Sequence, residues 1–240
     1  MSLALKLVLA PVLVAQALRT RKRAPVLPEA TGPRQGRIGQ GKAALRLLIA
    51  GDSSAAGVGV AHQDQALAGH LSRSLHRLTA RSVHWALHAR SGLTTRQVFA
   101  LLRAHALQAA DVAVVLTGVN DVIELVPTRR ALQQRAELAD WLLAEGRVGH
   151  VVFAPLPPVH RFPLLPEPLR RVMGADARRH DEALARWAAT RSDVSHIDIH
   201  LELGPEAMAE DGFHPGELVY RACGEALAAH IANLPTERAR

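Results

Sequence analysis

Short apolar runs alternate along this chain with longer segments in which apolar residues recur every three or four positions. The runs lie near residues 45–50, 83–87, 112–117, 149–154 and 194–199, and the longer patterns near 64–80, 95–108, 128–146, 169–189 and 216–232. Strands that alternate with helices are typical of a parallel sheet covered on both faces. We therefore expect an α/β fold of three layers, in which helices flank a parallel five-stranded sheet.

Ser53 comes just after the first of these runs, in the fragment Gly51-Asp52-Ser53. Gly51 turns the chain there, so the hydroxyl is presented beyond the carboxyl end of the expected strand, where open parallel sheets bind ligands. The small residues that follow, 54–59, can direct backbone N–H groups at a developing oxyanion. The alternative is an ordinary strand-to-helix turn with a serine as its N-cap.

Two further turns carry candidate hydrogen-bond donors. Asn120 and Asp121 follow the run at 112–117, and a side-chain amide can donate to an oxyanion without adding a charge. Gly92 follows the run at 83–87, and its lack of a Cβ lets its backbone N–H approach a substrate. Helix starts also account for both turns, because Asp121 can act as a helix cap.

Asp211 and His214 form the last fragment, followed by Pro215 and the helical pattern of 216–232. In a helical-type turn, a spacing of three places carboxylate and imidazole on one side. Asp211 can then accept a hydrogen bond from one ring nitrogen while the other faces Ser53. The alternative is a surface histidine before a helix start.

Taken in order, the four fragments resemble the blocks of the SGNH (GDSL-type) hydrolase family, and they span nearly all of residues 43–232. The resemblance implies Ser53 as nucleophile, His214 as general base and acid, and Asp211 as the carboxylate that orients it. It also implies an oxyanion hole made by the N–H groups of Ser53 and Gly92 and by the Asn120 amide. The implied fold is flavodoxin-like, and the implied reaction is ester cleavage through an acyl-enzyme.

One stretch departs from the commonest family pattern. The tripeptide Ala89-Arg90-Ser91 stands where an asparagine often precedes the glycine. The departure concerns the hydrogen bonding around Gly92 and leaves the catalytic set intact.

Charge divides the chain into two parts. The net charge of +7 belongs to residues 1–42, and the remainder is balanced. We therefore expect an N-terminal segment with a linker over 1–42, the linker running from Arg23 to Gly41, and one catalytic domain over 43–240. A basic surface on the fold is not expected, so no nucleic-acid partner is predicted.

Residues 3–18 are apolar except for Lys6 and Gln16, and fall short of the roughly 20 residues that a spanning helix needs. Three interpretations stay open: a helix over 3–23 that lies in a membrane interface, a secretory signal, or a helix packed on the domain. Positive charge after the apolar stretch favours the cytoplasmic side of a membrane. We expect a cytoplasmic protein associated with the inner face of the membrane, the alternative being a periplasmic or secreted one.

The loop at 155–166 is rich in proline and follows the fourth expected strand. Its Phe162, Leu164 and Leu165 can form a wall for an acyl chain, or else cover the core. Such a wall suits acyl esters or thioesters better than sugars. Sugar-binding sites usually call for aromatic platforms, and only 3% of the chain is aromatic.

No metal-ligand spacing, phosphate loop or dinucleotide fingerprint occurs, so neither a metal nor a cofactor is expected. Cys223 is the only cysteine, which excludes a disulfide within the chain. The leading interpretation is a serine esterase or lipase-like hydrolase acting on small-molecule or lipid esters with short to medium acyl chains. The alternatives are an acyltransferase, thioesterase or lysophospholipase with the same site, a catalytically silent binding module, and a scaffold tethered to a membrane or nucleic acid by 1–42.

Overall fold

The sheet has six strands in the order β1-β3-β2-β4-β5-β6. A computed structural model describes residues 3–40, 44–199 and 205–234. Its strands are β1 (Gln35–Ile38), β2 (Ala44–Gly51), β3 (Ser82–Ala89), β4 (Ala110–Leu116), β5 (Val148–Phe153) and β6 (Val194–His196). β2 to β6 are parallel to their neighbours, whereas β1 pairs with β3 in the antiparallel direction. The five expected parallel strands are confirmed.

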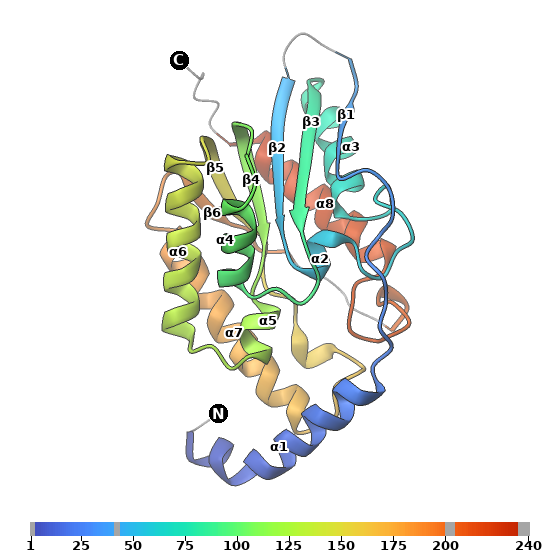
Figure 1. Cartoon of the computed structure of the whole chain (residues 1–240), viewed down its shortest axis with the longest axis vertical. Helices are drawn as coiled ribbons and strands as arrows, with labels where there is room; N and C mark the ends of the chain where they lie inside the picture. The colour runs from blue at the N-terminus through green and yellow to red at the C-terminus, as the bar shows by residue number, and fades with distance from the viewer. Residues whose placement is uncertain (1–2, 41–43, 200–204, 235–240) are drawn as a thin grey trace.

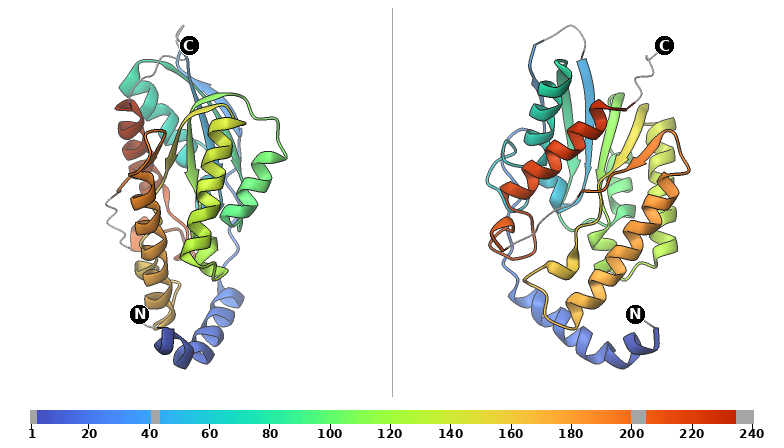
Figure 2. Two further views of the ribbon diagram at one scale, coloured as in Figure 1. Left: turned by 90° about the vertical axis from the view of Figure 1, so that its left-hand side faces the viewer. Right: turned by 180° about the vertical axis from the view of Figure 1, so that it is seen from behind.

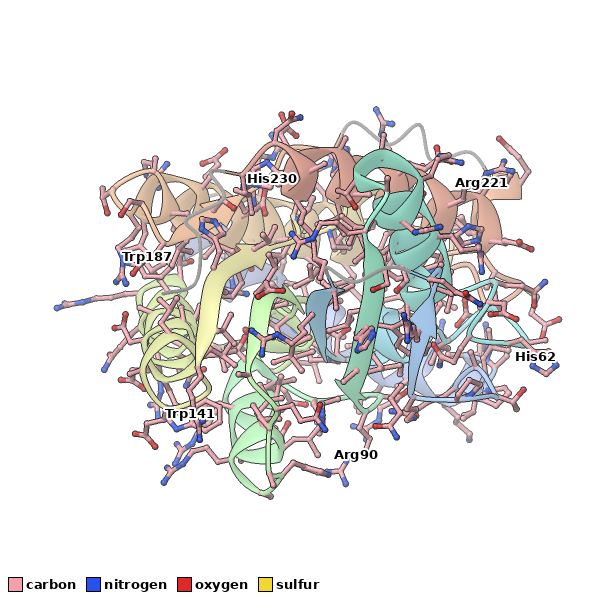
Figure 3. The ribbon with its side chains drawn as sticks, turned by 90° about the horizontal axis from the view of Figure 1, so that it is seen from above. His62, Arg90, Trp141, Trp187, Arg221 and His230 are labelled. Atoms are coloured by element: carbon pink, nitrogen blue, oxygen red, sulfur yellow. The ribbon has the colours of Figure 1, made fainter. Side chains whose placement is uncertain are left out.

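Helices cover both faces of this sheet, as the sequence predicts. The helices of the described residues are α1 (Leu3–Arg23), α2 (Ser53–Ala56), α3 (Leu67–Thr79), α4 (Thr95–Arg103), α5 (Val119–Ile123), α6 (Thr128–Ala144), α7 (Leu169–Ala188) and α8 (Glu217–Ala232), with 3-10 turns at Val159–Arg161 and Pro205–Ala207. Figure 1 shows α4 and α6 in front of the sheet and α8 behind it, beside α3. In the view from above, Trp141 of α6 and His230 of α8 lie on opposite sides of the strands (Figure 3).

The alternation of side chains along β2 explains why positions 47–50 of this strand are all apolar. Leu47 and Ile49 pack into the cluster shared with α3 and α8. Leu48 and Ala50 pack into the cluster shared with α4, α6 and α7. Because successive side chains point to opposite faces and both faces are covered, each of positions 47–50 is buried in one layer or the other, whereas Arg46 near the start of the strand is exposed.

The edge strand β1 lies inside the stretch that the sequence predicted as a linker, so that prediction is wrong for Gln35–Ile38. Its residues are mostly exposed, and it joins the sheet through backbone pairing with β3. A short edge strand of this kind carries no apolar pattern from which it could be predicted. The short helices α2 and α5 were also not predicted, α4 ends at Arg103 rather than near 108, and β6 ends at His196 rather than near 199. Gly41, the expected end of the linker, lies outside the described residues.

The N-terminal helix α1 packs across the start of α7. The Gln16 side chain donates to the Glu167 carbonyl at 2.6 Å and accepts from the Leu169 N–H at 3.1 Å. Leu13 packs against the apolar cluster that includes Phe162. Figures 1 and 2 show α1 at the end of the molecule toward which the parallel strands point. Among the described helices, none is long and apolar enough to span a membrane.

Candidate active site

Ser53 begins a one-turn helix directly beyond the central strand β2. The ladder to β4 continues past the end of β2, since the Asp52 N–H donates to the Leu116 carbonyl at 3.1 Å. The Asp52 carboxylate caps the turn by accepting from the Ser54 N–H at 3.0 Å. Gly57 then ends the helix in a left-handed conformation, with φ of +82°. Ser53 is thereby held at the carboxyl edge of the sheet.

His214 and Asp211 complete a hydrogen-bonded chain with Ser53. His214 Nε2 lies 3.1 Å from Ser53 Oγ, and His214 Nδ1 lies 2.5 Å from Asp211 Oδ2. The other carboxylate oxygen, Oδ1, accepts the backbone N–H groups of Phe213 and His214, each at 2.9 Å. With an ionised Asp211, the ring proton sits on Nδ1 and Nε2 is free to accept the serine proton.

The environment of Asp211 favours its ionised form. Burial by itself raises the pKa of this carboxyl group. The hydrogen bonds from the His214 ring and from the two backbone N–H groups oppose burial, and the net pKa lies below the ordinary value for aspartate. A carboxylate is therefore present to orient the imidazole at neutral pH.

Asn120 lies in the first turn of α5 and borders the same pocket as Ser53. Its Nδ2 donates to Asp52 Oδ2 at 3.2 Å and to the Leu93 carbonyl at 3.1 Å. Since an amide has two N–H groups, Asn120 must share or redirect one of them to donate to a substrate oxygen. Gly92, adjacent to Leu93, has φ of +77° and open space on the side where a Cβ would stand.

Asp52 is a buried acid beside these donors. Burial raises the pKa of Asp52 to about 7, and the negative charge of Asp121 adds to the increase. The bonds from Ser54 and Asn120 act in the opposite direction. Sequence reasoning noted Asp52 only as part of the serine motif, and no local pattern could have revealed a burial that depends on the packed fold.

Asp121 links the turn of Asn120 to the turn of Gly92. Its carboxylate accepts from the Thr95 N–H at 2.9 Å and from the Thr95 hydroxyl at 2.6 Å. The alternative that Asp121 caps the helix following it does not hold, because its carboxylate instead binds Thr95, the first residue of α4, whose N-cap is Thr94. The two turns that carry the expected oxyanion donors are thus tied together by one buried side chain.

Arg135 lies beneath the Asn120 turn and neutralises Asp121. The two side chains are fully buried, and Nη2 of Arg135 lies 3.2 Å from Asp121 Oδ2. A Cβ at Gly118 would stand 2.3 Å from that Nη2, and Gly118 has φ of +133°. Only glycine therefore allows the turn to rest directly on the guanidinium. No sequence pattern marks this contact, because Arg135 lies in a helix otherwise rich in charged residues.

The segment before β1 supports the Gly92 turn. Glu29 Oε1 accepts the Ser91 N–H at 2.6 Å. Arg34 forms an ion pair with Glu29 and donates to the Ala89 carbonyl at 2.6 Å. These contacts lie at residues 89–91, where the chain departs from the common family pattern. They could not be predicted from the sequence, because residues 23–41 were interpreted as a linker.

An apolar pocket opens beside Ser53 and His214. Its walls include Leu156 and Phe162 of the 155–166 loop, Phe213 beside His214, and Tyr220 and Cys223 of α8. Of the three side chains expected to form an acyl wall, Phe162 borders this pocket.

The other two expected wall residues lie elsewhere. Leu165 packs into the neighbouring core cluster, and the Leu164 N–H donates to the Gly212 carbonyl at 3.1 Å. Among the described residues, no group of three or more His, Cys, Asp or Glu side chains is placed to hold a metal.

The sequence matches the GDSL-like lipase/acylhydrolase family over residues 49–222. The chain belongs to this family. Ser53, Gly92, Asn120, Asp211 and His214 all fall within the matched region, and the family description supports an esterase. The four blocks on which the resemblance was based are thus part of a true family relationship.

Relatives of this GDSL-like protein differ widely in sequence. A GDSL-like esterase of Mycobacterium tuberculosis is 26% identical over 204 residues, which cover 81% of this chain and 64% of that protein. The chain therefore spans less than two-thirds of that relative's length.

Solved structures share the fold. The lipase Lip_vut3 from a goat rumen metagenome has a TM-score of 0.62 at 18% identity, covering 80% of this chain and 99% of its own. A member of the lipolytic G-D-S-L family from Veillonella parvula has a TM-score of 0.61 at 15% identity, with the same coverage. At such identities these two structures support the three-layer α/β architecture alone.

Proposed function

We propose that this protein is a serine hydrolase that cleaves carboxylic esters through an acyl-enzyme. The observation that carries the proposal is the chain of hydrogen bonds from Ser53 Oγ through the His214 ring to Asp211, at 3.1 and 2.5 Å, on the edge of an apolar pocket. A binding module has no need for a hydroxyl, an imidazole and a buried carboxylate in this alignment.

The reaction follows from the positions of these groups. His214 Nε2 takes the hydroxyl proton as Ser53 Oγ attacks the ester carbonyl carbon. The C–O bond to the alcohol then breaks, His214 returns the proton to the departing oxygen, and an acyl group remains on Ser53. Water, deprotonated by the same imidazole, hydrolyses this acyl-enzyme to a carboxylic acid and regenerates the serine.

The oxyanion of each tetrahedral intermediate would be held by the N–H groups of Ser53 and Gly92 and by the Asn120 amide. A donor that acts only in the transition state is worth roughly 10²–10³ in rate. For Asn120, the switch from Asp52 or Leu93 to the substrate oxygen exchanges a bond longer than 3 Å for a charge-assisted one.

The size of the pocket supports acyl chains of short to medium length. It encloses about 100 Å³. A buried cavity of about 150 Å³ takes up one benzene ring, so this pocket has room for a short acyl chain, and the remaining carbons of a medium chain would extend beyond it. Leu67, Cys223 and Leu227 line it in addition to the loop residues, so the chain would lie against apolar side chains.

The test is hydrolysis of p-nitrophenyl esters from acetyl to palmitoyl by the wild type and by Ser53→Ala. Turnover with an optimum at intermediate chain lengths, abolished in the variant, is the expected result. Labelling with a fluorophosphonate probe, followed by mass spectrometry, should locate the adduct on Ser53. The exposed Ser192→Ala is the matched control and should keep both labelling and turnover. Equal activity in wild type and Ser53→Ala would refute the serine mechanism.

A further inference from the structure

The outward side of α1 is apolar and exposed, although the helix is docked on the protein. Leu13 and Gln16 face the body of the molecule, where they contact the cluster around Phe162 and the start of α7. At 3.6 residues per turn, the opposite side carries the exposed side chains Val8, Val14 and Leu18, and the exposed Val12 lies on the flank. One side of this helix is thus used by the fold, and the other presents three large apolar side chains to the surroundings, with a fourth on the flank.

The charge of α1 is of one sign. Its sequence contains no Asp or Glu, and its last turns carry the exposed residues Arg19, Arg21, Lys22 and Arg23. Apolar side chains next to a cluster of cations match a lipid surface with anionic headgroups, which offers both an acyl boundary and negative charge. A second copy of the chain would offer this cluster another basic helix instead of an acidic surface.

The position of α1 relates this surface to the active site. Leu13 packs on the cluster formed by Leu156, Phe162 and Phe213, and these three side chains also border the pocket beside Ser53. Figure 1 places α1 at the same end of the molecule as the carboxyl ends of the strands. A surface that holds α1 therefore lies close to the wall of the pocket.

We propose that the outward side of α1 lies in the headgroup region of an anionic membrane and brings the pocket to amphiphilic acyl esters in that membrane. Binding requires only α1, whereas the substrate class rests on the proposed esterase function. The helix lies along the surface, in keeping with its docking on α7 and with the absence of a spanning helix among the described residues.

The experiment measures sedimentation of the full-length protein with vesicles. Vesicles of phosphatidylcholine alone are compared with vesicles that also contain phosphatidylglycerol, without substrate and at two salt concentrations. Binding is expected only with the anionic lipid. It should weaken with salt, because the screening length falls from about 30 Å at 0.01 M to 3 Å at 1 M.

Two matched pairs of variants locate the binding surface. Leu18→Glu should abolish binding, whereas Leu78→Glu on α3 makes the same change at a similar exposure, 52% against 64%, and should leave it intact.

The second pair removes four positive charges from one of two places. Glutamine at Arg19, Arg21, Lys22 and Arg23 should weaken binding roughly fivefold for each residue, or on the order of several hundredfold together. The control places glutamine at the four exposed arginines of the groove between α4 and α6, which are Arg96, Arg103, Arg129 and Arg130. Equal weakening by the two sets would overturn the assignment to α1, as would failure of the wild type to bind anionic vesicles at low salt. A dimer in solution that Leu18→Glu dissociates, with no vesicle binding, would assign the surface to a second copy.

Activity measurements separate this proposal from the esterase function. Leu18→Glu should hydrolyse a soluble butyryl ester at the wild-type rate, but an acyl ester carried in anionic vesicles more slowly. A protein that binds vesicles and hydrolyses neither ester would refute the esterase function and leave the membrane contact standing. Equal rates of the two proteins on the vesicle-borne ester would refute delivery to the active site.

Discussion

Replacement of Asp211 by asparagine tests whether the carboxylate sets the tautomer of His214. In the structure, Oδ1 accepts two backbone N–H groups at 2.9 Å, and Oδ2 faces His214 Nδ1 at 2.5 Å. An asparagine must keep its oxygen toward the two N–H groups. The flipped amide would leave both without an acceptor, at about 1–3 kcal/mol each. Its NH₂ group then faces Nδ1, which becomes an acceptor, and the ring proton moves to Nε2.

A proton on Nε2 prevents His214 from accepting the Ser53 proton. We expect Asp211→Asn to lower kcat by about 10⁴, equivalent to roughly 5 kcal/mol in the barrier, with little change in KM. The assay is steady-state hydrolysis of p-nitrophenyl butyrate at pH 7, with thermal unfolding to establish that the variant is folded. A folded variant that loses less than tenfold in kcat would refute the role of Asp211.

Three further predictions concern buried groups around the site. Because burial raises the pKa of Asp52 to about 7 in the folded protein, against an ordinary value of 3.8, the folded protein retains a proton between these pH values that the unfolded chain has lost. The free energy of unfolding of the wild type therefore falls as pH rises from about 4 to 7. Measured against the wild type, Asp52→Asn should gain at most about 4 kcal/mol between pH 4 and pH 8. Urea denaturation at both pH values tests this, and a constant difference between the two proteins would contradict it. Gly118→Ala should lower the free energy of unfolding by more than about 2 kcal/mol and reduce kcat, because its Cβ would clash with the guanidinium of Arg135. Gly92→Ala places its Cβ in open space, so it should lower the free energy of unfolding only by the strain of its positive φ, about 1–2 kcal/mol. Thermal unfolding of the two variants measures the difference. Phe162→Ala should shift the optimum of the ester series to longer acyl chains, because Phe162 borders the pocket. Leu165 is similarly buried in the same cluster but lies outside the pocket, so Leu165→Ala should lower stability alone. The same chain-length optimum in both variants would exclude Phe162 from the acyl site.

The parts of the site that could be predicted are those encoded by local order. The blocks of Ser53, Gly92 and Asn120 follow β2, β3 and β4, and parallel strands bring their carboxyl ends to one edge, so the proximity of these three residues follows from the alternation pattern. His214 lies well beyond the end of β6 at His196, and only the packed fold brings it to Ser53. The spacing of Asp211 and His214 is short enough to fix their contact within one turn. The family match confirms the predicted family, and the observed sheet confirms the predicted fold. The catalytic roles stay predictions.

The parts that could not be predicted depend on packing between distant segments. Arg135 is identical in type to the exposed arginines of its helix, and only the fold places it under Gly118. Likewise, the sequence left open whether the three apolar side chains of the 155–166 loop face a substrate or cover the core. The actual course of the loop turns Leu165 into the core, since proline restricts the backbone but does not determine which side chain points inward.

The edge strand β1 determines how far the chain can be shortened. It occupies one side of β3 from Val83 to Ala86, through residues that lie before the expected domain boundary at 42. A protein beginning at residue 43 would present the N–H and C=O groups of β3 as an open template, and such edges recruit other strands. Trimming the basic segment to improve solubility would therefore promote edge-to-edge aggregation, and the smallest monomeric unit must begin before Gln35.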